Sequence, residues 1–244
     1  MLKSVLKVVQ AAAMIVVVAL VSIQAPQMHR KYIRSLAEES SVKVVGDAGS
    51  GTGFHVDLDN GKQVILTNKH VCGIPGQLYV ESFNGDRVAV KILKLSKQHD
   101  LCALVRKDGL KFTHEGLKIS DKNPEIGEIL YTLGHPRGDA LNVATGEYFD
   151  NPEIELGSPI FTEQEFEACI KDGGRVGSFF IFNYCITKHA SIQLSTPTYP
   201  GNSGSAVVDW SGDVVAVIFA GNTEVENTGF AVPLSFVQEF VKSL

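Results

Sequence analysis

Short apolar runs with a period near two, separated by tight turns, fill most of this chain and restrict its fold more than any other feature. Alternation of this kind is typical of half-buried β-strands, and the Asn60-Gly61 and Asn84-Gly85 pairs favour hairpins between them. In the first half, the predicted strands are residues 41–45, 53–58, 63–67, 77–80, 87–93 and 101–105. Strands spaced so densely predict a closed barrel or a sandwich.

A second group of runs follows a linker around Asn123-Pro124 and predicts a second β unit of comparable size. Its predicted strands are residues 128–133, 140–144, 179–182, 191–194, 205–208, 214–218 and 229–232. Residues 148–178 are acidic and irregular, so we interpret them as a long inserted loop with a short helix at 163–171. Residues 234–241 have the apolar spacing of a helix that packs back on the second unit.

An apolar segment, residues 8–25, precedes the β-rich part of the chain. As a helix it would be about 27 Å long, close to the hydrocarbon thickness of a bilayer. The segment fits a membrane anchor or a cleaved signal peptide, although Ile23 and Pro26 leave no clean Ala-x-Ala cleavage site. A buried core helix is the third interpretation. Basic residues stand on both sides of the segment, so the charges do not predict its orientation.

The charged residues argue against a nucleic-acid partner. The net charge is −5, and the charged side chains are scattered along the sequence without a basic stripe. Proteins that hold phosphate backbones need such a stripe.

The cysteines are Cys72, Cys102, Cys169 and Cys185, and no two of them form a Cys-x-x-Cys motif. An even set suits two disulfides if the domain is exported, whereas four buried, reduced thiols would suit a reducing compartment. The spacing does not determine a pairing.

One polar tetrapeptide, Gly201-Asn202-Ser203-Gly204, runs directly into an apolar strand and could present a nucleophile. Glycines permit the positive φ of a tight turn, and such turns can point consecutive N–H groups into one concavity. The same tetrapeptide would also serve as an ordinary polar turn before a strand. Whether Ser203 is a nucleophile or part of an ordinary turn depends on whether the chain also supplies a base and an orienting carboxylate.

The order of residues along the chain limits which kind of serine enzyme is possible. All seven histidines precede Ser203, which excludes the α/β-hydrolase order, and Ser205 stands where that motif requires glycine. The subtilisin order needs long helices between parallel strands, and the sequence predicts almost none. The order His, Asp, Ser on two β units remains.

His70 and Asp100 are the candidate partners of Ser203. His70 follows a predicted strand, and Asp100 stands where a polar turn meets the next apolar strand. Taken separately, these two positions would be explained better by a structural histidine and a turn-capping aspartate.

Six segments, taken together, resemble those of a known family. They are residues 50–54 (Ser-Gly-Thr-Gly-Phe), 66–71 (Leu-Thr-Asn-Lys-His-Val), 100–104 (Asp-Leu-Cys-Ala-Leu), 133–138 (Leu-Gly-His-Pro-Arg-Gly), 200–206 (Pro-Gly-Asn-Ser-Gly-Ser-Ala) and 228–233 (Thr-Gly-Phe-Ala-Val-Pro). In order and context they resemble the trypsin-like serine peptidases, and in particular the bacterial Deg/HtrA-type peptidases. The resemblance covers about residues 45 to 240.

This resemblance implies an all-β fold of two six-stranded antiparallel barrels, chymotrypsin-like. The sequence pattern adds a C-terminal helix and a preceding N-terminal hydrophobic helix. We therefore expect a signal anchor or signal peptide (1–26), a connector (27–41), a first barrel (42–120) and a second barrel with the inserted loop (121–244). The implied activity is hydrolysis of peptide bonds in protein or peptide substrates, in protein quality control or processing. We expect a membrane-anchored or exported protein that needs no cofactor or metal.

The resemblance also implies a role for each site residue. Ser203 would attack the peptide carbonyl, His70 would accept its proton, and Asp100 would orient His70. The N–H groups of Gly201 and Ser203 would form the oxyanion hole. The substrate pocket would be lined by Pro197, Phe219, Ala220 and Gly221. Because none of these is acidic, we expect a small or medium apolar side chain before the cleaved bond, and not Lys or Arg.

The chain also departs from the family pattern. Ser205-Ala206 replaces the usual Gly-Pro after the nucleophile, the inserted span is longer than expected, and no sequence remains for a PDZ module.

Two rival hypotheses remain. The first is a catalytically silent, membrane-tethered β-barrel binding protein. The second is a structural zinc site built from His70, Cys72, His99 and Cys102, whose spacings differ from those of a standard finger. The same neighbourhood suits a Cys72–Cys102 disulfide or two unreactive thiols.

Overall fold

The computed structural model describes residue 14 and residues 25–74, 76–160, 163–171, 173–179, 182–222 and 225–244. The apolar segment 8–25, expected to be an anchor or a signal peptide, lies almost entirely outside these residues. None of the helices within them is long and apolar enough to cross a bilayer.

The first half of the chain forms a closed barrel with the strand order β1-β2-β3-β6-β5-β4. Its strands are β1 (Ser41–Gly46), β2 (Gly49–Asp57), β3 (Gln63–Thr67), β4 (Tyr79–Ser82), β5 (Arg87–Leu95) and β6 (Cys102–Arg106). In β3 and β6, alternate side chains serve two different cores, and the other strands contribute to one or the other. Val44, Ile65 and Leu104 belong to one cluster, whereas Phe54 and Leu66 belong to another that continues into the second half of the chain.

The second half forms another closed barrel, with the order β12-β15-β14-β13-β7-β8. Its strands are β7 (Ile129–Gly134), β8 (Asn142–Asp150), β12 (Ile192–Leu194), β13 (Ala206–Val208), β14 (Val214–Gly221) and β15 (Gly229–Pro233). All neighbouring strands in both barrels are antiparallel. The predicted fold class, with two six-stranded barrels, is confirmed.

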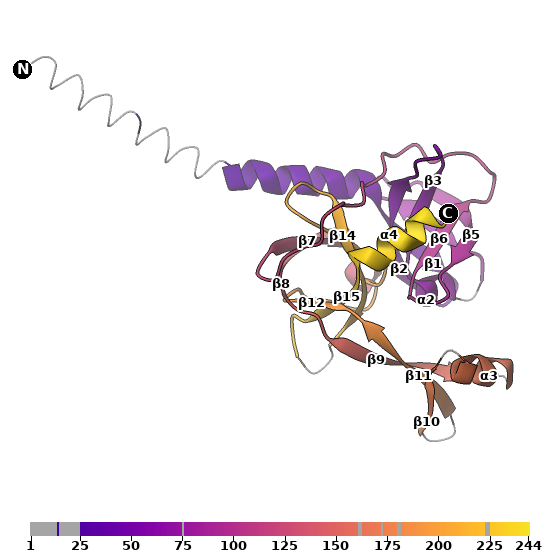
Figure 1. Cartoon of the computed structure of the whole chain (residues 1–244). Coiled ribbons are helices and arrows are strands. Elements are labelled where there is room, and N and C mark those ends of the chain that lie inside the picture. The colour runs from indigo at the N-terminus through magenta and orange to yellow at the C-terminus, as the bar shows by residue number, and fades with distance from the viewer. Residues whose placement is uncertain are drawn as a thin grey trace, which may run out of the picture.

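Helix α4 (Leu234–Lys242) ends the chain and packs beside the two barrels, as Figure 1 shows. Val237 and Phe240 are buried in the cluster that the barrels share. The Gln238 amide also donates to the Ser120 carbonyl at 2.7 Å, in the segment that joins the barrels. The predicted C-terminal helix is therefore present.

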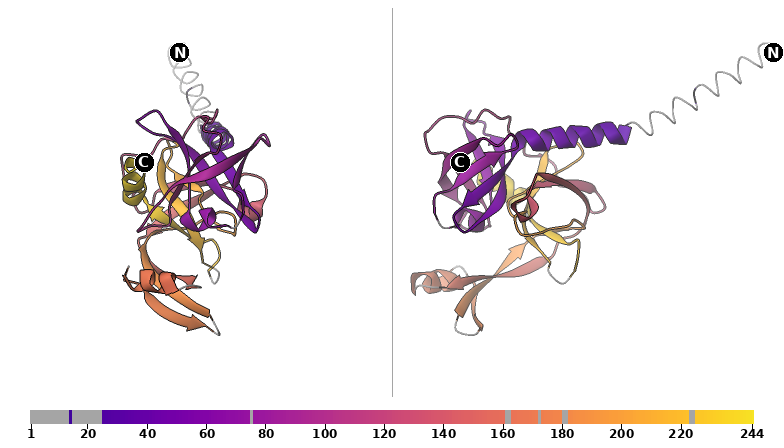
Figure 2. Two further views of the ribbon diagram at one scale, coloured as in Figure 1. Left: turned by 90° about the vertical axis from the view of Figure 1, so that its right-hand side faces the viewer. Right: turned by 180° about the vertical axis from the view of Figure 1, so that it is seen from behind.

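The expected connector before the first barrel is a helix over residues 25–40, which leads directly into β1. Ile33 and Ala37 face the protein and are fully buried. The Tyr32 hydroxyl donates to the Ser211 carbonyl at 2.8 Å, and the imidazole of His29 stacks on Trp210. This helix leaves the body of the protein at one side of the barrels (Figure 2).

The prediction that residues 148–178 form a loop was wrong, although the short helix predicted at 163–171 is present. After β8, the chain forms β9 (Glu153–Ile160), α3 (Glu163–Lys171), β10 (Arg175–Phe179) and β11 (Phe182–Ala190), and the strands make a sheet of order β10-β11-β9 that stands apart from the barrels (Figures 1 and 2). Its acidic residues suggested a solvated loop, but two of them are paired with basic residues on other strands. Arg175 lies 2.6 Å from Glu155, and Lys188 lies 3.7 Å from Glu153.

Both disulfides are formed. Cys72 is bonded to Cys102 in the first barrel, and Cys169 is bonded to Cys185 in the inserted sheet. The zinc hypothesis was wrong, because its two cysteines are consumed by a disulfide and cannot act as thiolate ligands. Among the described residues, no three or more His, Cys, Asp or Glu side chains are grouped so that they could hold a metal ion.

His55 is an unusual residue of the first barrel, because it points toward the core from the middle of β2. It is 1% exposed, and its ring lies 4.8 Å from that of Phe112 and 5.3 Å from that of His114. Burial, and then the neighbouring His114, lowers the pKa of His55 from 6.5 to about 4, while Asp57 acts in the opposite direction. His55 is therefore neutral at neutral pH.

We predict that His55 makes the stability of the fold sensitive to acid. The unfolded chain takes up this proton at a pKa near 6.5 and the folded chain only near 4, so the stabilisation is complete above pH 6.5 and is lost as the pH falls toward 4. Relative to His55→Phe, the wild type should lose about 3 kcal/mol of unfolding free energy between about pH 7 and about pH 4. Urea denaturation at both pH values measures this difference, and a constant difference would contradict the prediction.

Candidate active site

His70 and Asp100 are brought together at one end of the first barrel. His70 lies in the one-turn helix α2 (Lys69–Cys72), which follows β3, and Asp100 lies just before β6. The His70 Nδ1 atom is 2.5 Å from Asp100 Oδ2, and the His70 backbone N–H donates to Asp100 Oδ1 at 2.9 Å. Asn68 adds a third bond, from its side-chain amide to the Asp100 carbonyl at 2.8 Å. The carboxylate therefore fixes both the backbone and the ring of His70.

The two side chains differ in their access to solvent. The His70 side chain is 51% exposed, whereas that of Asp100 is 14% exposed. With Nδ1 held by the carboxylate, Nε2 is the ring nitrogen left to receive a proton. The arrangement can therefore act as an oriented base at the protein surface.

The Cys72–Cys102 disulfide strengthens this pairing. Cys72 stands two residues after His70, and Cys102 stands two residues after Asp100. Both cysteines are buried in the core of the first barrel. The covalent bond thus joins the two segments that carry the histidine and the aspartate.

The Ser203 loop belongs to the second barrel and depends on two glycines. Gly201 and Gly204 have φ values of +94° and +87°, a backbone conformation that residues with a Cβ atom rarely adopt. A Cβ atom on Gly204 would overlap the Thr52 carbonyl, and one on Gly201 would lie 2.5 Å from the His135 carbonyl. Glycine therefore lets this loop approach both barrels closely.

Thr52 of β2 holds the Ser203 loop against the first barrel. Its backbone N–H donates to the Ser203 carbonyl at 2.8 Å, and its hydroxyl donates to the Gly201 carbonyl at 2.8 Å. The same hydroxyl accepts a hydrogen bond from the backbone N–H of His135 at 2.9 Å. Sequence reasoning missed this positioning role, although Thr52 lies within the segment 50–54 that carried the family resemblance.

Gly51 shows how near Ser203 lies to the segment of His70. A Cβ atom built on Gly51 would be 2.6 Å from the Val71 side chain and 3.1 Å from the Ser203 carbonyl oxygen. Within the described residues no hydrogen bond joins Ser203 to His70. Catalytic hydrogen bonds are often long without substrate and shorten in the complex, so this geometry is compatible with a nucleophile and its base.

The backbone N–H groups proposed for the oxyanion hole are free of backbone partners in the described part of the chain. The intervening Asn202 N–H donates to the Tyr199 carbonyl at 3.0 Å, and the Gly204 N–H donates to the Ile218 carbonyl at 2.8 Å. No such bond is formed by the N–H groups of Gly201 and Ser203. These two donors remain available for an oxygen atom outside the protein.

The predicted pocket residues come from segments on both sides of the Ser203 loop. Phe219 is 5% exposed, Ala220 is partly buried, and Gly221 lies so close to Thr198 that a Cβ atom would be 2.9 Å from its carbonyl oxygen. Pro197 is tied to the loop, because the Asn202 amide donates to its carbonyl at 3.4 Å.

His189 of β11 is a neighbour of this region that sequence reasoning missed. Its ring lies 6.3 Å from that of Phe219. Burial lowers the pKa of His189; Asp100 acts against this shift, and Lys69 adds to it. The inserted sheet therefore reaches the candidate site through this strand, and no local sequence signal indicated that contact.

The family of the chain follows from its sequence. The family model described as "Trypsin-like peptidase domain" matches residues 51–217, which include His70, Asp100 and Ser203. The chain belongs to the trypsin-like peptidase family.

The curated relatives agree with this family. A "Serine protease HtrA-like" from Staphylococcus aureus (strain USA300) is 26% identical over 202 residues, which cover 81% of this trypsin-like chain and 23% of the relative. The chain thus spans about a quarter of the length of the curated relatives it matches.

Two solved structures support the fold. The active form of the Rv3671c protease from M. tuberculosis has a TM-score of 0.66 and 18% identity, covering 88% of this chain and 84% of that chain. The serine endoprotease from Yersinia pestis has a TM-score of 0.63 and 19% identity, covering 88% of this chain and 65% of that chain.

We predict that Thr52→Val will destabilise the contact between the barrels. The change keeps the shape of the side chain but removes the hydroxyl that serves Gly201 and His135, and each buried polar group left without a partner costs about 1–3 kcal/mol. Urea denaturation should show a loss of unfolding free energy in this range. Thr132→Val, a buried change in β7 outside this bonding network, is the control. Equal stability of the two variants would contradict the assigned role of Thr52.

Proposed function

We propose that this chain is a serine endopeptidase that uses Ser203 as nucleophile, His70 as general base and Asp100 as the residue that orients the base. The observation that carries the proposal is the two-point attachment of His70 to Asp100, with the Ser203 loop docked by Thr52 at the same end of the first barrel. Membership of the trypsin-like peptidase family supports the reaction class.

The first half of the reaction would form an acyl-enzyme. His70 Nε2 removes the Ser203 proton while Oγ bonds to the carbonyl carbon of the peptide. The developing imidazolium is stabilised by Asp100, and the carbonyl oxygen, now negative, accepts bonds from the Gly201 and Ser203 N–H groups. His70 then gives the proton to the leaving amine, and the peptide C–N bond breaks.

The second half would release the product by the same groups. Water takes the place of the amine, His70 removes its proton, and the resulting hydroxide attacks the ester. Collapse of the second tetrahedral intermediate returns the proton to Ser203 and frees the carboxylate product. No group outside the chain is required for any of these proton transfers.

We predict that a fluorophosphonate probe will label the full-length protein at Ser203. The probe reacts with a serine only when a base and an oxyanion site activate it, so Ser203→Ala should remove the label. His70→Ala should lower the labelling rate by at least about 10³-fold, since loss of either residue has a comparable effect in related triads. Gel fluorescence and mass spectrometry of the labelled peptide measure both results.

Ser211→Ala provides the matched control, because Ser211 is an exposed serine in the turn between β13 and β14. The Ser211→Ala variant should be labelled by the probe to the same extent as the wild type. A folded wild type that resists the probe, with proteolytic activation of a latent form excluded, would favour the silent β-barrel binding protein instead.

We propose that the pocket formed by Pro197, Phe219, Ala220 and Gly221 receives a small or medium apolar side chain. Phe219 is buried, and none of the four offers a charge to a lysine or arginine of the substrate. A methylene group in such a pocket changes the specificity by only about 1–3 kcal/mol, so the preference should be graded. Cleavage sites in a peptide library, read by mass spectrometry, test this. Predominant cleavage after Lys or Arg would exclude the proposed pocket.

We propose that the domain acts on protein substrates outside the reducing cytosol, in quality control or processing, and that residues 8–25 anchor or export it. The two disulfides support an oxidising compartment. Alkaline extraction of isolated membranes is the measurement that separates an anchored protein from a peripheral one.

A further inference from the structure

The second barrel carries an aromatic cluster where it meets the helix over residues 25–40. The cluster consists of His29 and Tyr32 on the helix, Tyr131 on β7 and Trp210 in the turn between β13 and β14. The rings of His29 and Trp210 are stacked with their centroids 3.3 Å apart, and His29 lies 5.4 Å from the ring of Tyr131. Trp210 is nevertheless 59% exposed, so much of its indole is open to solvent.

Two exposed apolar side chains extend the aromatic cluster. Met28 precedes Tyr32 by four residues and therefore lies on the same side of the helix. Ile129 precedes Tyr131 by two residues and therefore lies on the same face of β7. An exposed patch of this composition indicates a protein or membrane interaction surface.

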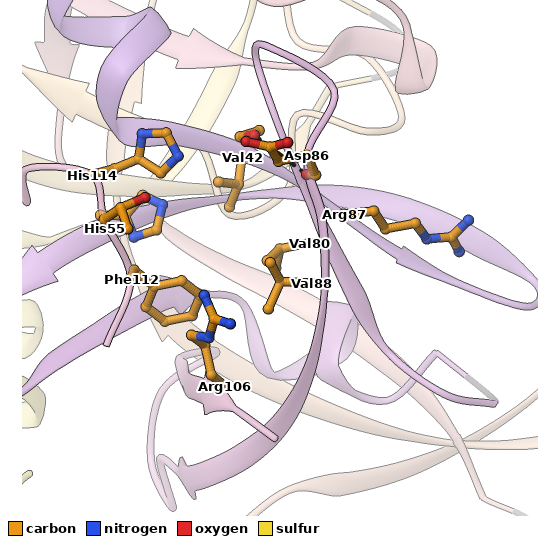
Figure 3. Close-up of a pocket in the computed structure, with 11 residues that line it drawn as sticks. Val42, His55, Val80, Asp86, Arg87, Val88, Arg106, Phe112 and His114 are labelled. Carbon is orange, nitrogen blue, oxygen red and sulfur yellow. Dashed lines mark hydrogen bonds between the residues drawn. The ribbon is translucent and has the colours of Figure 1, made fainter. Parts of the chain in front are cut away.

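The hollow of about 260 Å³ in the first barrel has a different character (Figure 3). It is lined by Asp86, Arg87 and Arg106 as well as by valines. Such a mixed lining selects no class of ligand, whereas the aromatic cluster has a definite chemistry.

The turn that carries Trp210 is fixed to the helix. The Tyr32 hydroxyl donates to the Ser211 carbonyl at 2.8 Å, and a Cβ atom on Gly212 would lie 2.5 Å from the Leu36 side chain. Beside these contacts, Ile33 of the helix is fully buried. The second barrel therefore keeps a fixed position relative to the start of the helix.

The start of the helix is also the end of the apolar segment 8–25. The helix begins at Ala25, and His29 is four residues further along, which is about 6 Å on a helix axis. The headgroup region on each side of the hydrocarbon core is about 5–8 Å deep. With residues 8–25 in the core, the stacked rings of His29 and Trp210 lie at the level of the lipid headgroups.

The residues at this level suit a lipid surface. Tryptophan and tyrosine favour the headgroup layer, because each ring has an apolar body and a polar edge. Arg30 and Lys31 are exposed on the same part of the helix, and neither is in an ion pair with another described residue. Both can therefore attract anionic headgroups. The carboxylate of Asp209, in the turn, already accepts hydrogen bonds from Ser211 and from the backbone N–H of Asp213.

We propose that the aromatic cluster docks the second barrel on the surface of a lipid bilayer, with Trp210 in the headgroup layer. The proposal rests on the anchoring role proposed for residues 8–25. Docking would hold the domain against the bilayer in one orientation. A second copy of the chain, or residues 8–25 folded back, would instead cover the cluster with protein.

The fluorescence of Trp210 tests the docking, because Trp210 is the only tryptophan of the chain. The full-length protein is reconstituted in vesicles of phosphatidylcholine and phosphatidylserine, with or without a lipid that carries a nitroxide on its headgroup. A nitroxide quenches an indole only at short range. We expect the nitroxide lipid to reduce the emission of Trp210 by at least about half, as for a tryptophan of an interfacial belt. Flotation of the vesicles measures how much protein is anchored.

A relocated tryptophan provides the first control. Trp210→Phe combined with Phe166→Trp moves the single indole to an exposed position of α3, which lies on the other side of the barrels from the helix (Figures 1 and 2). Its emission should not respond to the nitroxide lipid. Equal quenching at both positions would overturn the proposal.

A charge placed in the cluster provides the second test. Ile129→Glu keeps Trp210 but adds a carboxylate beside it, so quenching by the nitroxide lipid should fall by at least about half. Leu110→Glu is the matched control, because Leu110 is also exposed but lies in the first barrel after β6; its quenching should equal that of the wild type. Unchanged quenching in Ile129→Glu would contradict the docking.

The remaining outcomes separate the docking from the anchoring. Protein that floats with the vesicles while Trp210 is not quenched would overturn the docking and leave the anchor intact. If Trp210 is then also protected from iodide in the water, protein covers the cluster instead of lipid. Protein that does not float would overturn both proposals. Labelling of Ser203 by the fluorophosphonate probe is measured separately and depends on neither.

Discussion

The candidate site depends on the bonds between Thr52 and the Ser203 loop, because His70 and Asp100 belong to one barrel and Ser203 to the other. The backbone N–H of Thr52 donates to the Ser203 carbonyl, and its hydroxyl donates to the Gly201 carbonyl. Two glycines with positive φ make the close approach possible. A shift of about 1 Å between catalytic groups can cost about 10²-fold in rate, so the function requires this contact to be rigid.

Much of the fold could be predicted because each barrel strand carries its own signal. Val64, Ile65 and Leu66 of β3 all face packed neighbours, and the runs in the other strands are bounded by glycine and asparagine turns. The candidate residues were found for a related reason. His70 and Asp100 occur at the ends of such strands, where the chain order and the family resemblance gave them a common role.

The remaining features arise from contacts between residues far apart in the sequence. The role of Thr52 depends on a loop about 150 positions later, and the proximity of His189 to Phe219 depends on how the inserted sheet leaves the barrel. The sheet itself was missed because its acidic residues resemble a solvated loop until Arg175 and Lys188 are placed opposite them. Period and composition describe one strand at a time and cannot report such pairings.

The two disulfides stabilise segments with very different packing. Cys102 is fully buried in the first barrel, where many apolar side chains already hold its neighbours. In the inserted segment from β9 to β11, Cys169 of helix α3 is the only buried residue among those whose side chains the structure describes. Its disulfide closes a loop with a sequence separation of 16, worth about 3 kcal/mol in the chain-entropy model. The disulfide therefore adds a covalent restraint to the β10-β11-β9 sheet, whose strand β11 carries His189 near the candidate site.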